Sequence, residues 1–230
     1  TTFIILILYI ISSFLMLLLP KAEVEVLDSE TNLEILLKGW KLVARDPRLR
    51  LFVSANLLEI FSNTIWVSSI ILVFVTELLN ETESYWGYSN TAYSIGIIIS
   101  GFIAFRLSEK FLAAKWESIL FPLVGMVIVT LTILYFPNAQ MFLLFSALVG
   151  MLSQLKEVPE SVFLQETVEE NNLVNVYSVL EVISTLAFSV FVLIMSYITE
   201  NFGISISFWL SAICLMIEAI LIYIRRDYFK

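Results

Sequence analysis

The chain of 230 residues contains no histidine and a single cysteine, Cys214. Zinc sites are built mainly from histidine and cysteine side chains, so this composition argues against a zinc site. One cysteine cannot form a disulfide bond within the chain. Serine–histidine catalysis needs a histidine, and no paired-aspartate spacing is present. We therefore expect a protein that is not an enzyme and that needs no metal or cofactor.

Charged residues are also scarce. They make up 15% of the chain, against 59% hydrophobic residues, and the mean hydropathy is +0.91. A soluble domain is closer to a quarter charged and half apolar. A helix crosses a bilayer with about 20 mainly apolar residues, and the sequence offers seven such runs. We predict an all-α integral membrane protein with seven transmembrane helices, at residues 2–19, 49–79, 85–105, 119–136, 141–164, 173–199 and 204–224. The second and sixth runs exceed the bilayer thickness, which predicts tilted helices.

The thirteen lysine and arginine residues fall, with one exception, in residues 21–50, 106–115 and 225–230. The exception, Lys156, lies inside a predicted span. Cytoplasmic loops are enriched in basic residues, whereas acidic residues, and so the net charge of −8, say little about orientation. The basic loops all fall on one side, which predicts a multi-pass protein of the cell (plasma) membrane with a cytoplasmic C-terminus. Because the chain begins with Thr1 inside an apolar run, we expect it to be a piece of a longer protein.

The long first connection contains a predicted amphipathic helix within "DSETNLEILLKGWKLVARDPRLR", residues 28–50. Ser29 or Thr31 can cap its start, and Asp46 followed by Pro47 ends it. Apolar residues recur on one side at helical spacing: Leu33, Leu36, Leu37, Trp40 and Val43 or Ala44. Such a basic amphipathic helix fits the inner membrane surface, with Trp40 at headgroup depth. The alternative is a helix packed on soluble protein.

One span, a long linker and six further spans with a basic tail resemble the C-terminal half of a major facilitator superfamily transporter. The resemblance implies that residues 1–20 are the last helix of the N-terminal half. Residues 21–48 would be a cytoplasmic linker with an amphipathic surface helix, and residues 49–230 the six-helix C-terminal bundle. The missing N-terminal half of the same protein would then be a partner of this chain.

Two segments resemble the drug-efflux branch of macrolide-efflux and enterobactin-exporter-like antiporters. They are "LLKGWKLVARDPRLR" (36–50) and "VPESVFLQETVEENNLVNVYSVLEV" (158–182), in which Pro159 precedes the pair Gln165-Glu166. "GIIISGFIAFRLSEKF" (96–111) resembles the superfamily's loop motif between helices eight and nine, through Gly101, Arg106 and Lys110. The aspartate of that motif is missing, and Ala104 or Phe105 stands near its place. A gating role of Arg106 and Lys110, which the resemblance implies, would have to work without that aspartate.

The segment "SANLLEIFSNTIW" (54–66) carries a carboxylate inside a predicted span. Asn56, Glu59, Asn63 and Trp66 are spaced three or four residues apart and share one helix face. Glu59 would lie about 15 Å from the inner surface, where an acid costs about 2.5–3.5 kcal/mol. Burial favours a protonated carboxyl, so this face is a candidate proton or substrate site. The alternative is a structural acid hydrogen-bonded to Asn56 or Asn63. Helix seven, which this span resembles, lines the central cavity of the superfamily.

A second polar face on the sixth predicted span consists of Asn175, Ser178, Glu181 and Thr185. Glu181 is a candidate cavity acid or a charge at the inner rim, with Ser178 and Thr185 beside it. The fifth span carries three charged residues around Pro159: Lys156, Glu157 and Glu160. Lys156 and Glu160 can pair, because they lie four residues apart, in a structural or gating ion pair.

Two further features concern the third and the last span. Glu218 on the last span is predicted at the inner rim, paired to Arg225 or Arg226 of the tail. Small residues repeat every four positions along the third span and predict close helix packing: Ala92, Gly96, Ser100 and Ala104.

These features favour secondary active transport, with proton-coupled export of a hydrophobic or cationic small molecule of the drug or siderophore type by alternating access. The partners would be the substrate, protons and the lipid bilayer, with no nucleic acid. The alternative is a seven-helix membrane receptor or sensor, which the number of spans and the orientation also fit. The last span has no lysine for a retinal Schiff base, which argues against a photoreceptor.

Overall fold

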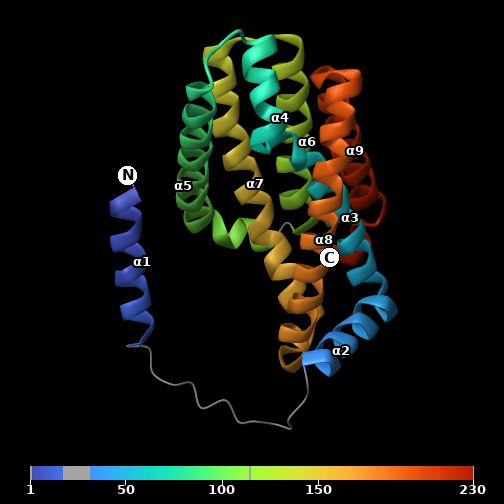
Figure 1. The fold of residues 1–230 in the computed structure, drawn as a ribbon. Helices are drawn as coiled ribbons and strands as arrows, with labels where there is room; N and C mark the ends of the chain where they lie inside the picture. Colours follow the sequence, from blue (N-terminus) through green and yellow to red (C-terminus); the bar gives the residue numbers. More distant parts are fainter. Residues whose placement is uncertain (1, 18–31, 114, 230) are drawn as a thin grey trace. The chain divides into compact units, whose positions relative to one another are not determined.

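The computed structural model describes residues 2–17, 32–113 and 115–229, and their regular secondary structure is all helical (Figure 1). The chain divides into two units, Thr1–Leu33 and Glu34–Lys230. The first contains α1 (Thr2–Leu17), whose 16 residues fall short of the roughly 20 that span a bilayer. The last two residues of the predicted span 2–19 lie outside the described residues, so that span stays a prediction.

The second unit is a helical bundle. Its elements are α2 (Asn32–Arg45, which begins at the boundary between the units), α3 (Pro47–Asn63), η1 (Thr64–Trp66), α4 (Ser68–Val73), η2 (Phe74–Leu78), α5 (Ser84–Ala113), α6 (Lys115–Tyr135), α7 (Ala139–Thr167), α8 (Glu170–Phe202), α9 (Ile204–Ile224) and η3 (Arg226–Phe229). In the described chain, α5 to α9 are five helices long and apolar enough to cross a membrane. The bent segment from α3 to η2 makes a sixth if it is one span. The predicted all-α membrane fold is confirmed, and the count of seven spans stays a prediction.

The predicted span 49–79 is a broken helix rather than one long tilted helix. The hydroxyl of Thr64 donates to the carbonyl oxygen of Phe61 at 2.6 Å, where a tight turn of 3₁₀ helix follows α3. Val67 then adopts an extended backbone with φ −66° and ψ 139°. Segments Pro47–Trp66 and Ser69–Leu78 consequently differ in direction by 45°. Local side-chain bonding to the backbone competes with the regular helix pattern and favours such a break.

Asp46 separates α2 from α3, and the helix that the sequence predicted there does end at Arg45. The Asp46 carboxylate caps α3 by accepting a hydrogen bond from the backbone N–H of Arg48 at 2.8 Å. Its other oxygen lies 3.0 Å from the Arg48 guanidinium. Partial burial would raise the pKa of Asp46, but these bonds to Arg48 outweigh it and lower the pKa below the usual value. Pro47 suits the first helical position because no N–H is needed there.

Helix α2 packs against the first turns of α8, at the lower end of the bundle in Figure 1. A Cβ added at Gly39 would lie 2.2 Å from the carbonyl oxygen of Asn175, so glycine permits this approach. Val43 is buried, whereas Leu37 and Trp40 are 49% and 45% exposed. The helix is therefore held by its Gly39–Val43 side and leaves other apolar side chains uncovered. Its place at the membrane surface stays a prediction.

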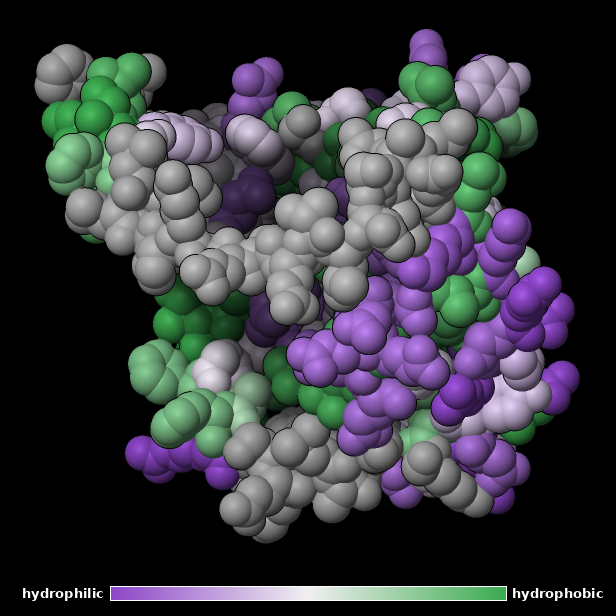
Figure 2. All heavy atoms as spheres, turned by 90° about the horizontal axis from the view of Figure 1, so that it is seen from below, coloured by the Kyte–Doolittle hydropathy of each residue, from purple (hydrophilic) through white to green (hydrophobic). Residues whose placement is uncertain are grey.

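The same end of the bundle carries many hydrophilic side chains, which Figure 2 shows from below. Exposed charged and polar residues there come from α2 and from the turn between α7 and α8: Lys38, Lys41, Arg45, Gln165, Glu166, Glu169 and Glu170. Both signs of charge are present, so this end is polar rather than purely basic.

Helices α5 and α7 meet backbone to backbone through two glycines. A Cβ at Gly96 would lie 1.9 Å from the carbonyl oxygen of Ala147, and one at Gly150 would lie 2.2 Å from that of Tyr93. Real Cβ atoms do not approach backbone oxygens so closely, so both glycines are required for this packing. The predicted close packing of the third span is confirmed at Gly96.

Buried aromatic rings hold α7 to its neighbours at both ends. In one half of the bundle, Phe74 of η2 lies 5.3 Å from the Phe142 ring of α7. In the other half, the Phe163 ring of α7 lies 6.1 Å from Phe52 of α3 and 4.5 Å from Phe229 of η3. The stretch of α7 between these two aromatic groups contains Lys156.

Candidate functional site

Lys156 is the centre of a buried charge cluster, defined here as Lys156, Glu59, Glu160 and Glu218. Its ammonium nitrogen lies 2.6 Å from Glu59 Oε2, 2.8 Å from Glu160 Oε1 and 2.9 Å from Glu218 Oε1. The three carboxylates come from α3, α7 and α9, and their nearest oxygens all lie within 4.8 Å of one another. The side chains of Lys156 and Glu218 are 1% and 0% exposed, those of Glu59 and Glu160 15% and 16%. The cluster ties three helices together.

Glu218 occupies a different environment from the one the sequence predicted. It is buried and in contact with Lys156, whereas the prediction placed it at the inner rim beside Arg225 or Arg226. The predicted partner was wrong, because the face of α9 that carries Glu218 packs into the bundle, next to the buried residues Leu215 and Ala219. The depth of Glu218 in the membrane stays a prediction. The 2.9 Å contact with Lys156 lacks hydrogen-bond alignment, and neither Glu218 oxygen has another hydrogen-bond partner among the described residues. One carboxylate of the cluster is therefore enclosed yet incompletely satisfied.

Glu59 pairs with Lys156 rather than with an asparagine of its own helix. Lys156 donates to Glu59 Oε2 at 2.6 Å. Asn56, one turn earlier, instead accepts a hydrogen bond from the hydroxyl of Ser184 on α8 at 3.1 Å. The alternative of a Glu59 bonded to Asn56 or Asn63 is therefore not what the structure contains. The predicted pair of Lys156 with Glu160 is present, extended by two further acids.

A second interhelical contact lies one turn further along α3. The hydroxyls of Ser62 and Ser211 are 2.5 Å apart, and both side chains are buried. Ser211 also donates to the backbone oxygen of Ser62 at 3.1 Å, so the Ser62 hydroxyl donates to Ser211. This pair fixes the register of α3 against α9 beside the charge cluster.

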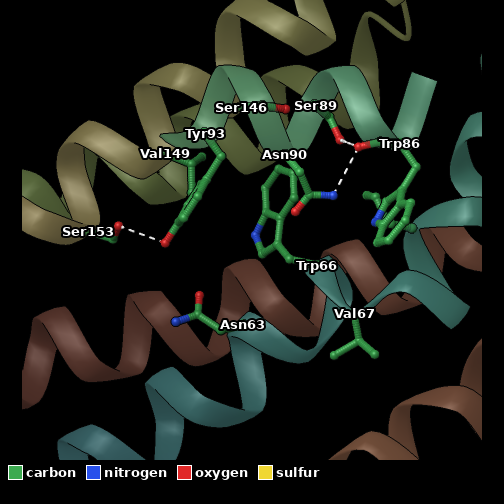
Figure 3. Close-up of a pocket in the computed structure, with 11 residues that line it drawn as sticks. Asn63, Trp66, Val67, Trp86, Ser89, Asn90, Tyr93, Ser146, Val149 and Ser153 are labelled. Atoms are coloured by element: carbon green, nitrogen blue, oxygen red, sulfur yellow. Dashed lines mark hydrogen bonds between the residues drawn. The ribbon is translucent and has the colours of Figure 1, made fainter. Parts of the chain in front are cut away.

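A cavity of about 290 Å³ lies beyond the cluster, between α5, α7 and the segment that joins α3 to η1. Aromatic, amide and hydroxyl side chains line it: Asn63, Trp66, Trp86, Asn90, Tyr93 and Ser153 among others (Figure 3). None of the 11 lining side chains is charged. The Ser153 hydroxyl donates to the carbonyl oxygen of Gly150 at 3.1 Å, so the Tyr93 hydroxyl, 3.2 Å away, donates to Ser153. This bond connects the two helices at the wall of the cavity.

The cavity and the cluster share two helices. Asn63 follows Glu59 by four residues on α3, and Ser153 precedes Lys156 by three residues on α7. At 1.5 Å per residue, the lining residues begin about 5 Å along each helix from the cluster. A compound in the cavity would therefore lie about one helical turn from the buried charges.

The second predicted polar face does not join this site. Asn175 is buried beneath α2, Ser178 donates to the backbone of its own helix, and Glu181 and Thr185 are exposed, with a 3.4 Å bond between them. Glu157 is exposed although it follows Lys156 directly.

Arg106, the first basic residue of the candidate loop motif, is also exposed. The side chain of Lys110 lies outside the described residues. Roles of these residues in transport or gating stay predictions.

Sequence reasoning missed Glu218 as a member of the cluster and missed the contribution of α5 to the cavity, through Trp86, Asn90 and Tyr93. One signal was available for Glu218. Lys156 is the only basic residue in the interior of a predicted span, since Arg50 lies at the very start of one, and a buried cation needs carboxylates. The acids within other spans were therefore the candidates for its partners. No comparable signal marks the three α5 residues, because aromatic residues near a helix end are common at membrane interfaces.

The Major Facilitator Superfamily model matches residues 52–230. The chain belongs to the major facilitator superfamily. It is thus part of a multi-pass membrane protein of that superfamily. The broken segment from α3 to η2 is the first of the six spans predicted from residue 49 onward. Because its relatives are transporters, the chain is not part of an enzyme, and a receptor or sensor is not favoured.

Two relatives from Bacillus subtilis (strain 168) resemble the chain in sequence. It is 29% identical over 188 residues to the uncharacterized MFS-type transporter YfmI, which covers 80% of this chain and 46% of the relative. It is 30% identical over 187 residues to the uncharacterized MFS-type transporter YjbB. That match covers 81% of this chain and 46% of the relative. The chain spans about half the length of these relatives.

Among solved structures, the in meso crystal structure of the POT family transporter PepTSo matches with a TM-score of 0.61 and 15% identity. The match covers 80% of this chain and 38% of that one. At this identity the likeness concerns the fold alone, and it supports the helical bundle described above.

Proposed function

We propose that the protein containing this chain is a proton-coupled secondary transporter that exports a hydrophobic or cationic small molecule, of the drug or siderophore type. In this proposal the chain has seven spans: residues 1–20 supply the last helix of the N-terminal half, residues 49–230 supply the six-helix C-terminal bundle, and the missing part of the N-terminal half completes the transport path. The buried cluster around Lys156 carries the proposal. It would take up and release the coupling proton.

Charge balance supports a proton in the cluster. Two carboxylates no more than 4.8 Å apart repel by at least about 3.5 kcal/mol at an effective dielectric constant of about 20. On the same scale, an ammonium 2.9 Å away attracts a carboxylate by about 6 kcal/mol. A third ionised carboxylate would meet two such repulsions, about 7 kcal/mol together, which exceed the attraction. The cluster is therefore expected to keep at least one carboxyl protonated.

For a second ionised carboxylate, the attraction to Lys156 and the opposing energies nearly cancel. Its attraction to Lys156 exceeds one repulsion by at most about 2.5 kcal/mol. Removing a carboxylate from water costs several kcal/mol, an amount of the same size. A small change in access to water, as in alternating access, can then decide whether this group binds a proton. Glu59 and Glu160 are the groups for that exchange, because they retain some exposure while Glu218 has none.

The test uses the full-length protein in inside-out membrane vesicles. Proton-driven uptake of ethidium, a cationic dye, and acridine, an uncharged one, is measured in wild type and in Glu59→Gln. We expect Glu59→Gln to lose proton-driven accumulation of whichever dye is transported, because glutamine keeps the shape but cannot exchange a proton. Exchange of dye against dye without a pH gradient should continue in this variant, since it requires no proton.

Glu117→Gln is the matched control, because Glu117 is exposed near the start of α6 and the chemical change is the same. It should transport as wild type does. Proton-driven accumulation that survives in Glu59→Gln, Glu160→Gln and Glu218→Gln alike, at normal protein levels, would refute the role of the cluster.

A further inference from the structure

The proton cycle uses the Lys156 cluster and leaves the neighbouring cavity without a role. We propose that this cavity, between α5, α7 and the α3–η1 segment, binds the transported compound. We infer that the compound is planar, aromatic and uncharged, with a hydrogen-bond acceptor on its edge. This inference rests on the proposed function and narrows its substrate class.

Aromatic side chains supply flat walls. The Trp66 ring is nearly parallel to the buried Phe142 ring, with 6.2 Å between centroids and 13° between planes. This contact with Phe142 fixes the orientation of the Trp66 ring. Trp86 and Tyr93 line the same cavity from α5 (Figure 3). Faces of this kind favour an offset-stacked ring, and a bound aromatic compound gains stacking energy in addition to the burial of its surface.

Hydrogen-bond donors line the cavity as well. Among the described residues, neither the Asn63 side-chain amide nor the indole N–H of Trp66 donates to a protein acceptor, and both residues are half-buried. Both donors keep contact with solvent, because neither is among the buried polar atoms that lack a partner. A ligand that covers them must accept these hydrogen bonds in place of water, since a buried donor without an acceptor costs free energy. An aromatic ring nitrogen or a carbonyl group on the ring edge would meet this requirement.

The absence of charge in the lining selects against a cation. The nearest carboxylate on α3, Glu59, lies one turn from Asn63 and already binds Lys156 at 2.6 Å. A cation in the cavity would therefore lose its water without gaining a direct carboxylate partner, which is costly. An uncharged compound avoids that cost.

The size of the cavity limits the compound further. A volume of about 290 Å³ lies at the lower end of the range for small-molecule sites, about 300–1,000 Å³. A compound of two or three fused rings matches a site at this end of the range, and the open side of the cavity leaves room for substituents.

Binding of two probes that share a ring system but differ in charge tests the inference. The full-length protein is placed in lipid nanodiscs without a pH gradient, at mildly alkaline pH, and equilibrium dialysis measures saturable binding of acridine and of N-methylacridinium. Acridine is uncharged under these conditions and has a ring nitrogen that accepts a hydrogen bond. N-methylacridinium has the same ring system, carries a permanent positive charge and has lost the acceptor. We expect acridine to bind at least about tenfold more tightly.

Two substitutions locate the binding. Trp86→Leu should weaken acridine binding roughly tenfold, through lost stacking and burial. Trp209→Leu is its matched control, because Trp209 is 41% exposed, as Trp86 is 38%, but lies on α9 outside the cavity lining. Asn90→Asp places a carboxylate in the lining and should shift the preference toward N-methylacridinium, a gain that misfolding cannot produce.

Three results would overturn the inference: no saturable binding of acridine, equal or tighter binding of N-methylacridinium by wild type, or equal losses in Trp86→Leu and Trp209→Leu. Because no gradient is applied, these results do not depend on whether Glu59 couples protons. A failure of the proposed function and a failure of this substrate site are thus separately visible.

Discussion

Replacing Lys156 with methionine removes the only cation from the charge cluster while keeping much of the side-chain volume. Three carboxyl groups would then remain in contact with one another, and every group that was ionised must bind a proton or stay unpaired. Keeping one glutamate protonated at neutral pH costs about 4 kcal/mol relative to its ionised form in water. This value agrees with the roughly 3–5 kcal/mol for breaking a buried ion pair. We expect Lys156→Met to lose about that much stability at neutral pH.

The loss should depend on pH with a defined sign. The folded variant binds at least one proton more than its unfolded chain, so its free energy of unfolding decreases as pH rises, by about 1.4 kcal/mol per pH unit for each extra proton. Thermal unfolding of the full-length protein in detergent, from about pH 5 to about pH 8, measures this slope against wild type. Lys41→Met, at an exposed position on α2, is the control and should show the same, smaller slope as wild type. A Lys156→Met variant that is as stable as wild type, or a loss that is independent of pH, would refute the reasoning.

Three further changes test the packing and the helix start. Gly150→Val should lower the free energy of unfolding by about 1–3 kcal/mol, because the added side chain meets a backbone oxygen. Gly101→Ala should leave the free energy of unfolding almost unchanged, because open space surrounds Gly101. Asp46→Ala should cost about 1 kcal/mol. The pKa of Asp46 is lowered in the folded protein. Its contribution to the free energy of unfolding is therefore complete above the usual aspartate pKa of about 3.9 and is lost only as pH falls through the lowered pKa. A pH series of melting curves checks this. Ser62→Ala and Ser211→Ala should be coupled by about 0.6 kcal/mol in a double-mutant cycle, and purely additive effects would contradict the hydroxyl contact.

Hydropathy alone located most of the helices. The last predicted span, 204–224, coincides with α9, and the other four helices in α5 to α9 begin and end within a few residues of their predicted limits, α5 extending further at its end. Long apolar runs define such helices whatever their neighbours are. The end of α2 at Arg45 was equally predictable, because the Asp46-Pro47 pair stops a helix through local sterics.

Features that depend on contacts between helices were harder to predict from the sequence. The predicted pair of Lys156 with Glu160 lies within one helix and follows from spacing, but the contacts with Glu59 and Glu218 require the packing of α3, α7 and α9. The break at Val67 was missed because nothing in that apolar run contains proline or glycine, the usual sequence marks of a kink. The cavity likewise depends on how closely Gly150 lets α5 approach α7.

The charge cluster also bears on the insertion of the protein into the membrane. Lys156 and Glu160 belong to the same helix and lie 2.8 Å apart, so α7 can enter the bilayer with its cation already neutralised. Glu59 on α3 and Glu218 on α9 have no such partner on their own helices in the described structure, and each must enter as a protonated acid or bear a cost of about 2.5–3.5 kcal/mol. Because α9 follows α3 and α7 in the chain, Glu218 meets Lys156 only when α9 packs. The completed bundle is therefore expected to become markedly more resistant to extraction and proteolysis at that step of its synthesis.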